Sequence, residues 1–310
     1  MAAFPLAYIC WALADNRVRK ACDRLMEEVF AGELLYEVLQ TPEAMALKLD
    51  REQSLYAIGD TVLASAAPAG PGLGPDSMIG NMLRGHLKTD MWIGVALSVA
   101  DLDAARDWVR ARGFEPRSYA GMEDRYFLLN RDETLGVRIE CLHGSLNNDP
   151  RLREGWRPER WRDEHPLGLV GLQSIGVSTP DLAQSQAIFA DRLGWPEVGR
   201  RELVAEGASC ASYLIGDAVI EAMTPVEKDT PLERHARDVR GIYCLTFQVR
   251  SAPDAAEWLR SKGFTLIGDP KRRFAVDPAQ MCGRRLYFTD EAAPGCEIRP
   301  TAIRTPALLR

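Results

Sequence analysis

The sequence lacks several features that identify particular classes of protein. Its formal net charge is −6, and acidic and basic residues are mixed along the chain, so there is no basic stripe that could follow a phosphate backbone. No apolar run approaches the roughly 20 residues that span a bilayer. The apolar start MAAFPLAYICWALADNRVRK has no basic n-region or small-residue cleavage site and breaks at Asp15. We therefore expect neither nucleic acid nor a membrane as a partner, and no signal peptide.

Paired cysteines and clustered histidines are also missing. The seven cysteines form no CxxC motif, and their odd number argues against a disulfide framework. This pattern predicts reduced thiols and a cytoplasmic location. The four histidines are spread through the chain, in or next to the segments that we interpret below as connections: His86, His143, His165 and His235.

What the sequence does contain is an internal duplication. The segment LYAIGDTVLASAAP, from Leu55, matches SYLIGDAVIEAMTP, from Ser212. A second segment, VALSVADLDAARDWVRARGF from Val95, matches LTFQVRSAPDAAEWLRSKGF from Leu245. Because 310 residues are enough for two domains of about 150 residues, the chain is predicted to consist of two similar halves.

A third, weaker match aligns Ile9 with Ile175 and marks the start of each half. The predicted boundaries are an N-terminal domain over residues 1–145, a linker over 146–166 and a C-terminal domain over 167–310. The linker is charged and rich in proline, and it has neither helical nor alternating apolar periodicity. Its tryptophans, Trp156 and Trp161, are expected to pack the linker onto one domain.

Each half in turn divides into two modules of one strand, one helix and three strands. In the second half, a strand around Ile175–Ser178 precedes a helix that begins at Pro180-Asp181 and closes at Gly194. Strand signals then run through Ser212–Met223, with a hairpin turn at Gly216-Asp217. The same order repeats from Ile242, with a helix that ends at Gly263. The pattern is thus βαβββ, twice in each half.

Strings such as SIGVSTPDLAQSQAIFADRLGW and YFLLNRDETLGVRIECL resemble the vicinal oxygen chelate superfamily. That superfamily includes glyoxalase I, methylmalonyl-CoA epimerase, extradiol ring-cleaving dioxygenases and bleomycin-binding proteins. The resemblance covers about residues 5–142 and 168–300. It implies an α+β fold in which four βαβββ modules form two glyoxalase-like half-barrel domains, with the second half as the working one.

The resemblance also implies a place for a metal, bound by side chains of the first and last strands of each module. A Lewis acid with open positions would there bind two neighbouring oxygens of a substrate. The first-strand histidine of the family falls on Tyr8 in one half and on Ser174 in the other, and the second modules offer Gly94 and Cys244. None of these is a histidine, so we expect no resident cofactor, with a divalent metal left open.

The carboxylate positions implied by the family are kept in part. The first-module glutamate falls on Ala64 in the first half and on Glu221 in the second, and Glu140 takes the last-strand position of the first half. In the second half the register is open. Counting from Tyr287 gives Glu297, whereas counting from Gly295 gives Arg299, and both choices point to the same strand face.

Each candidate has a functional and a structural interpretation. For Glu221 the two are evenly balanced, since a lone carboxylate on an apolar face suits proton transfer but can equally form a salt bridge. For the other three candidates the structural interpretation is the simpler one. Tyr287 is then a strand aromatic, Glu140 a partner of Arg138, and Cys244 a buried hydrophobe. The clusters Lys271-Arg272-Arg273 and Arg284-Arg285 are interpreted as solvated loop charge, with anion binding as the alternative.

Three functions remain in competition. In the first, the second half is an enzyme, a lyase or isomerase that moves a proton on a small carbonyl-containing or aromatic metabolite. Its predicted catalytic residues are Glu221, Tyr287 and Glu297, and its predicted substrate-binding residues are Ser174, Cys244, Arg299 and Tyr243. The second is a non-catalytic, bleomycin-resistance-like binding protein. The third is a divergent extradiol-type dioxygenase. All three imply a small-molecule ligand, and a homodimer is left open.

Overall fold

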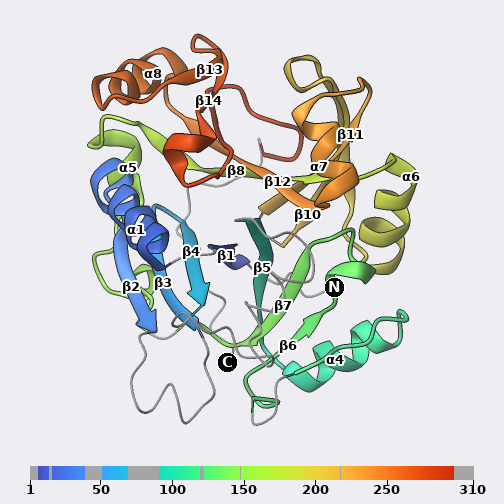
Figure 1. Cartoon of the computed structure of the whole chain (residues 1–310). Helices are drawn as coiled ribbons and strands as arrows, with labels where there is room; N and C mark the ends of the chain where they lie inside the picture. Colours follow the sequence, from blue (N-terminus) through green and yellow to red (C-terminus); the bar gives the residue numbers. More distant parts are fainter. Residues whose placement is uncertain are drawn as a thin grey trace.

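The computed structural model describes residues 6–13, 16–38, 51–68, 91–118, 122–146, 148–216 and 218–296. Its strands form two mixed sheets, with the first half of the chain around one and the second half around the other (Figure 1). The strands of the first sheet come from residues 6–143 and those of the second from residues 169–289. The predicted α+β class with two tandem half-barrel domains is confirmed.

The first sheet has seven strands in the order β2-β3-β4-β1-β5-β7-β6. Among the described residues, two helices accompany it, α1 (Asn16–Phe30) and α4 (Leu102–Arg110). Its strands are β1 (Leu6–Ala12), β2 (Glu33–Val38), β3 (Arg51–Ile58), β4 (Thr61–Pro68), β5 (Met91–Val99), β6 (Tyr126–Leu129) and β7 (Arg138–His143), and a 3-10 turn, η2 (Arg131–Glu133), precedes β7.

The second sheet has eight strands in the order β13-β14-β15-β12-β8-β11-β10-β9. Its strands are β8 (Leu169–Ser178), β9 (Glu197–Leu203), β10 (Ala208–Ile215), β11 (Ala218–Pro225), β12 (Gly241–Val249), β13 (Leu266–Asp269), β14 (Arg273–Val276) and β15 (Leu286–Thr289). Its helical segments are α6 (Leu182–Ser185), η4 (Gln186–Arg192), η5 (Val204–Glu206), α7 (Pro231–Asp238), α8 (Ala252–Ser261) and η6 (Pro278–Met281).

Strand pairing reproduces the predicted modules. In each module the first strand pairs in parallel with the last: β1 with β4, β5 with β7, β8 with β11, and β12 with β15. The two modules of a half then join through their first strands, which pair antiparallel as β1 with β5 and β8 with β12. The second half is therefore one continuous sheet built from two βαβββ units. The first half is also one sheet, but within the described residues its second module has one strand, one helix and two strands, with an isolated bridge between Arg117 and Leu128.

Short polar side chains cap two helices of the second half, and the first of these begins at Asp181, as the sequence predicts. Asp181 accepts a hydrogen bond from the backbone N–H of Gln184 at 2.7 Å, and Ser251 accepts one from Asp254 at 3.3 Å. The segment that follows Asp181 starts as an α-helix and continues in the π form until Arg192. Gly194 then turns the chain with a φ of +64°, a left-handed conformation that favours glycine.

The linker packs onto the first half through its tryptophans, as predicted. It contains a 3-10 turn, η3 (Pro150–Leu152), and a short helix, α5 (Glu159–Asp163). The indole of Trp161 is buried and donates a hydrogen bond of 2.7 Å to the carbonyl of Phe30, at the end of α1. Trp156 lies 5.1 Å from Trp161, centroid to centroid.

The two halves share one hydrophobic core. Phe30 of α1 stacks on Phe288 of β15 at 6.3 Å, and the guanidinium of Arg192 lies 3.8 Å from the ring centre of Phe114. Where the sheets meet, Gly136 and Gly241 are in backbone contact: a Cβ atom at Gly136 would lie 2.5 Å from the nitrogen of Gly241. Any larger residue would force the halves apart at this point.

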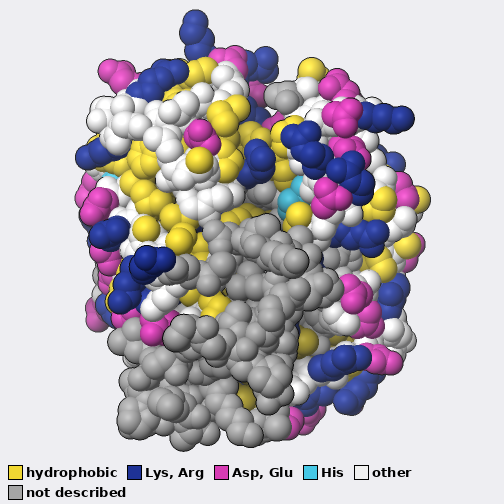
Figure 2. All heavy atoms as spheres, viewed as in Figure 1, with side chains coloured by type: hydrophobic (Ala, Val, Ile, Leu, Met, Phe, Trp, Pro, Cys, Tyr) yellow, Lys and Arg dark blue, Asp and Glu magenta, His cyan; other side chains and the backbone are white. Residues whose placement is uncertain are grey.

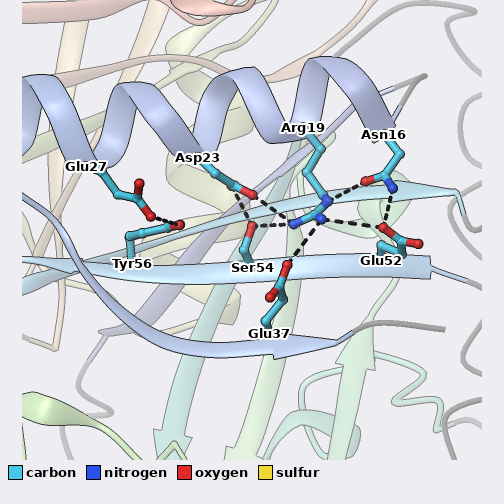
Figure 3. A network of polar contacts seen from close by, with 8 residues as sticks. All are labelled: Asn16, Arg19, Asp23, Glu27, Glu37, Glu52, Ser54 and Tyr56. Carbon is cyan, nitrogen blue, oxygen red and sulfur yellow. Dashed lines mark hydrogen bonds and ion pairs between the residues drawn. The ribbon is translucent and has the colours of Figure 1, made fainter. Parts of the chain in front are cut away.

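A polar network lies between α1 and the first sheet (Figure 3). The side chain of Arg19 is fully buried and forms ion pairs with Asp23 at 2.9 Å, and with Glu37 and Glu52 at 3.4 Å each. It also donates to the hydroxyl of Ser54 at 2.8 Å. Burial raises the pKa of Asp23, against the opposing effects of Ser54 and Arg19. Arg19 is thus the charge that allows several carboxylates to gather under one helix.

The surface of the described residues is mixed in charge. On the face shown in Figure 2, basic and acidic side chains alternate around the edge, with hydrophobic side chains between them. Among the helices that the structure describes, none has the length and apolar character needed to cross a bilayer.

Candidate functional site

The candidate site lies on one face of the second sheet, which we call the inner face. On the opposite face, Ile175, Ile220 and Leu245 join the main core together with side chains of η4 and α8. Side chains alternate along a strand, so the residues next to these core positions point to the inner face. Ser174 and Glu221 are two of them. Part of this face is covered by a small hydrophobic cluster of Leu203, Ala208, Cys210, Met223, Leu232, Tyr243 and Cys244.

Strand pairing confirms the alignment of the two halves. In the first half Cys10 pairs with Ala64 and with Gly94, and in the second half Gly176 pairs with Glu221 and with Cys244. Ala64 and Glu221 are therefore structural counterparts, as the duplicated sequence predicts. The second half has a carboxylate where the first has only a methyl group.

Glu221 is buried and held by two side chains from neighbouring strands. Its side chain is 1% exposed. Ser174 of β8 donates a hydrogen bond to Oε2 at 2.5 Å, and Arg201 of β9 donates two to Oε1, at 3.0 Å from Nε and 2.5 Å from Nη2. Directly opposite Glu221 on β10 is Ser212, whose buried hydroxyl has no hydrogen-bond partner among the described residues.

A second charged pair crosses the same face. Arg273 of β14 donates from Nε to Oε1 of Glu206, in η5, at 2.8 Å. Its Nη1 lies 3.4 Å from the hydroxyl of Thr246, and its guanidinium lies 4.5 Å from the ring centre of Tyr287. Burial opposes the charge of Arg273, but the carboxylate of Glu206 and other nearby anionic groups outweigh burial and raise its pKa. This arginine therefore stays a cation inside the fold.

The remaining polar groups of the face are neutral. Burial raises the pKa of the Cys244 thiol and of the Tyr243 phenol to about 12, and it raises that of Tyr287 further. The charges of Arg273, Glu206 and Glu221 all affect the pKa of the Cys244 thiol. Cys244 is thus a buried hydrophobe, as predicted.

The register of the last strand differs from both predicted choices. β12 pairs with β15 so that Thr246 lies next to Tyr287, just as Ala96 lies next to Glu140 in the first half. Tyr287 is therefore the counterpart of Glu140, and neither Glu297 nor Arg299 takes that position. Both of these residues lie outside the described part of the chain. Both counts ran past Thr289, where β15 ends.

The residues at the implied metal positions do not fit a divalent cation. These positions hold Ser174, Glu221, Cys244 and Tyr287 in the second half, and Glu221 already accepts two hydrogen bonds from Arg201. The hydroxyl of Ser174 already donates to Glu221, and burial keeps the thiol and the phenol protonated. A metal ligand must present a lone pair, and a thiol must lose its proton to bind. Within the described ranges, no group of three or more His, Cys, Asp or Glu side chains could hold a metal ion.

Three of the charged residues on this face escaped the sequence interpretation. Arg273 was assigned to a solvated loop, but it is largely buried. Arg284, which was assigned in the same way, is fully enclosed in the core. The only signal was an arginine inside an apolar strand, RFAV. Arg201 and Glu206 gave no signal at all, because their strand and turn, β9 and η5, have no apolar alternation.

His235 also lies at the rim of this face, although the sequence placed it in a connection between modules. It is on α7, with Nδ1 2.8 Å from the hydroxyl of Ser178 and its ring edge-on to Tyr243 at 5.2 Å. Burial lowers the pKa of His235 to about 4, so the ring is neutral at physiological pH. The guanidinium of Arg285 lies 5.0 Å from the ring centre of Tyr243.

The first half has a different arrangement on the corresponding face. The phenol of Tyr8 donates to Oε2 of Glu140 at 2.9 Å. Burial raises the pKa of Tyr8 well above its usual value. The surrounding residues form a second hydrophobic cluster that includes Cys10, Ala64 and Met91. Each half therefore has a carboxylate that accepts a hydrogen bond from its first strand, half-buried in the first half and buried in the second.

Comparison with known proteins supports these observations. A family model described as the Glyoxalase/Bleomycin resistance protein/Dioxygenase superfamily matches residues 173–280. Among solved structures, a triple mutant of 4-hydroxymandelate synthase from Streptomyces coelicolor is similar with a TM-score of 0.68 and 13% identity, over 97% of this chain and 98% of that one. At this identity the likeness concerns the fold alone.

Shorter structures match only part of the chain. Methylmalonyl-CoA epimerase from Mycobacterium tuberculosis aligns with 41% of this chain and 90% of its own, at 23% identity and a TM-score of 0.37. A hypothetical protein, BH1468, from Bacillus halodurans aligns with 40% of this chain and 96% of its own, at 18% identity and a TM-score of 0.36. No curated protein sequence matches the chain.

Proposed function

We propose that the chain is an enzyme whose working site is the inner face of the second half, the half that matches the glyoxalase/bleomycin resistance protein/dioxygenase family model over residues 173–280. It acts on a small carbonyl-containing or aromatic metabolite by proton transfer, as a lyase or isomerase. The proposal rests on one observation above all: Glu221 is a buried carboxylate held in a single orientation by Ser174 and Arg201, where the first half has Ala64.

The contacts of Glu221 leave it able to accept a proton. An ionised carboxylate has about four acceptor sites, and the three hydrogen bonds from Ser174 and Arg201 use three of them. One site is left for a substrate proton. Rigid orientation favours this chemistry, because a general base must lie within hydrogen-bond reach of the proton that it removes.

The surroundings suit a small ligand with an apolar body. Binding sites are typically apolar with a few convergent polar groups, and here the cluster around Met223 and Cys244 adjoins Glu221, Ser212 and Arg273. Tyr243 and Tyr287 add aromatic surface, and Tyr287 is a neutral phenol that can donate to a carbonyl oxygen. Tyr287 and Glu221 are the two predicted catalytic residues that we retain.

A second candidate is a non-catalytic binding protein. The observation that favours it is that both oxygens of Glu221 already have protein partners, as in a structural ion pair. In that case the same face would bind its ligand without altering it. For either function we propose a cytoplasmic location, since none of the seven cysteines, all within the described ranges, forms a disulfide.

Incubation with a panel of carbonyl-containing and aromatic metabolites, followed by mass spectrometry and chromatography, separates the two candidates. The enzyme predicts conversion of at least one compound by the wild-type protein. It further predicts that Glu221→Gln loses the conversion while Glu140→Gln, the matched change in the first half, keeps it. Binding of a compound without conversion would instead identify the binding protein.

A further inference from the structure

The ion pair of Arg273 and Glu206 joins distant parts of the second sheet. Arg273 lies on β14, next to one edge of the strand order, whereas Glu206 lies in η5, between β9 and β10 at the other edge. The two side chains meet over the inner face and are only 16% and 3% exposed. The pair is therefore part of the interior of the half-barrel rather than of its surface.

The pair is only half formed. Arginine and a carboxylate commonly make two parallel hydrogen bonds, but here Nε bonds to Oε1 and the second rung is missing. Nη2 of Arg273 and Oε2 of Glu206 are both buried, and neither has a hydrogen-bond partner among the residues described. Since buried polar atoms in native proteins are nearly always hydrogen-bonded to protein, water or ligand, these two atoms mark a place where another group binds.

We propose that this open rung recognises the edge of a neutral carboxamide or lactam on the ligand of the proposed site. The carbonyl oxygen of the ligand accepts from Nη2 of Arg273, and its N–H donates to Oε2 of Glu206. This inference rests on the proposed function only in taking the inner face of the second half as the ligand site. It adds the chemical class of the ligand.

Charge and hydrogen-bonding pattern together select a neutral edge. A carboxylate presents two acceptors, one of which would face the anionic Glu206, and an amidinium presents two donors, one of which would face the cationic Arg273. Leaving either charge buried and mispaired is costly. An adjacent donor and acceptor satisfies both atoms, and the apolar cluster around Tyr243 and Met223 provides for the rest of the molecule.

Four probes with the same ring test this pattern in the full-length protein: benzamide, benzoate, benzamidine and acetophenone. Their dissociation constants are measured by isothermal titration calorimetry. We expect benzamide to bind at least roughly tenfold more tightly than each of the other three, because only it satisfies both buried atoms. Binding of benzoate as tightly as benzamide, or more tightly, would overturn the proposal. So would the absence of binding of all four probes at millimolar concentration, which would mean that a buried water lies between Nη2 of Arg273 and Oε2 of Glu206.

Two variants and one control locate the effect. Arg273→Met should abolish the preference for benzamide. Glu206→Gln, which is nearly isosteric, should shift the preference toward benzoate, because it removes the negative charge and can supply a donor. Arg272→Gln is the matched control, since Arg272 is adjacent but 69% exposed and pairs with the exposed Glu291. Unchanged probe preferences in folded Glu206→Gln would also refute the assignment.

Failure here is distinguishable from failure of the proposed function. If the probes show no preference while Glu221→Gln still stops conversion in the metabolite panel, only the recognition of a carboxamide or lactam is wrong. If benzamide is selected as expected but the wild-type protein converts nothing, the inner face binds such ligands without catalysis.

Discussion

Removing Arg201 should destabilise the protein because it leaves Glu221 charged and buried. Glu221 is 1% exposed, and two of its three hydrogen bonds come from Arg201, which is itself 25% exposed. Breaking a buried ion pair from one side costs about 3–5 kcal/mol, and the partial exposure of Arg201 points to the lower end. We therefore expect Arg201→Met to lower the free energy of unfolding by about 3 kcal/mol.

The double variant Arg201→Met/Glu221→Leu makes this prediction specific. It removes both charges, so it should recover most of the loss, since replacing a buried pair by apolar residues is often neutral. Urea unfolding followed by circular dichroism measures all three proteins. Arg200→Met is the control, because Arg200 is adjacent on β9 but 54% exposed, and it should change stability by less than about 0.5 kcal/mol. A double variant less stable than Arg201→Met would contradict the reasoning.

Three further predictions concern the rest of the fold. Arg19→Met should lower the free energy of unfolding in urea by about 3 kcal/mol, because Asp23, Glu37 and Glu52 lose their shared cation. Arg24→Met, on the exposed face of α1, should lower it little. Equal effects of the two variants would contradict the buried network. His235 has a folded pKa of about 4 against an ordinary 6.5, so its contribution to stability is present above pH 6.5 and is lost as the pH falls toward 4, by up to about 3 kcal/mol. The free energy of unfolding of His235→Gln should therefore depend less on pH in this range. Parallel profiles of the variant and the wild-type protein would argue against a buried neutral ring. Cys244, with a pKa of about 12, should not react with Ellman's reagent at pH 8 in the native protein, whereas the partly exposed Cys282 should. Peptide mapping locates the label. Labelling of Cys244 would contradict this prediction and show that the inner face is open to reagents.

The architecture could be predicted from sequence because the duplication carries it. Matching segments in the two halves gave the module order and correctly aligned Ala64 with Glu221 and Gly94 with Cys244, which strand pairing confirms. A local signal also sufficed for the start of the helix after Asp181, which caps it as short polar residues do elsewhere.

The site could be predicted only in part, because its charges are brought together by long-range contacts. Arg273 and Glu206 are far apart in sequence and meet only when the second sheet curls. Only the apolar residues that follow it in RFAV distinguish Arg273, which is largely buried, from the exposed Arg272 beside it. The last-strand register failed for a related reason: only the pairing of β15 with β12 reveals that Tyr287 is the counterpart of Glu140.

The central claim is that Glu221 moves a proton on a bound metabolite, and solvent deuterium tests it most directly. Each compound of the carbonyl panel is incubated in D₂O with the wild-type protein, with Glu221→Gln and with Glu140→Gln, and its mass is followed over time. We predict that one compound gains deuterium next to its carbonyl group with the wild-type and Glu140→Gln proteins, and that Glu221→Gln slows this gain by roughly 10²–10⁴-fold. Incorporation by Glu221→Gln at the wild-type rate, or conversion of a compound without any deuterium gain, would contradict it.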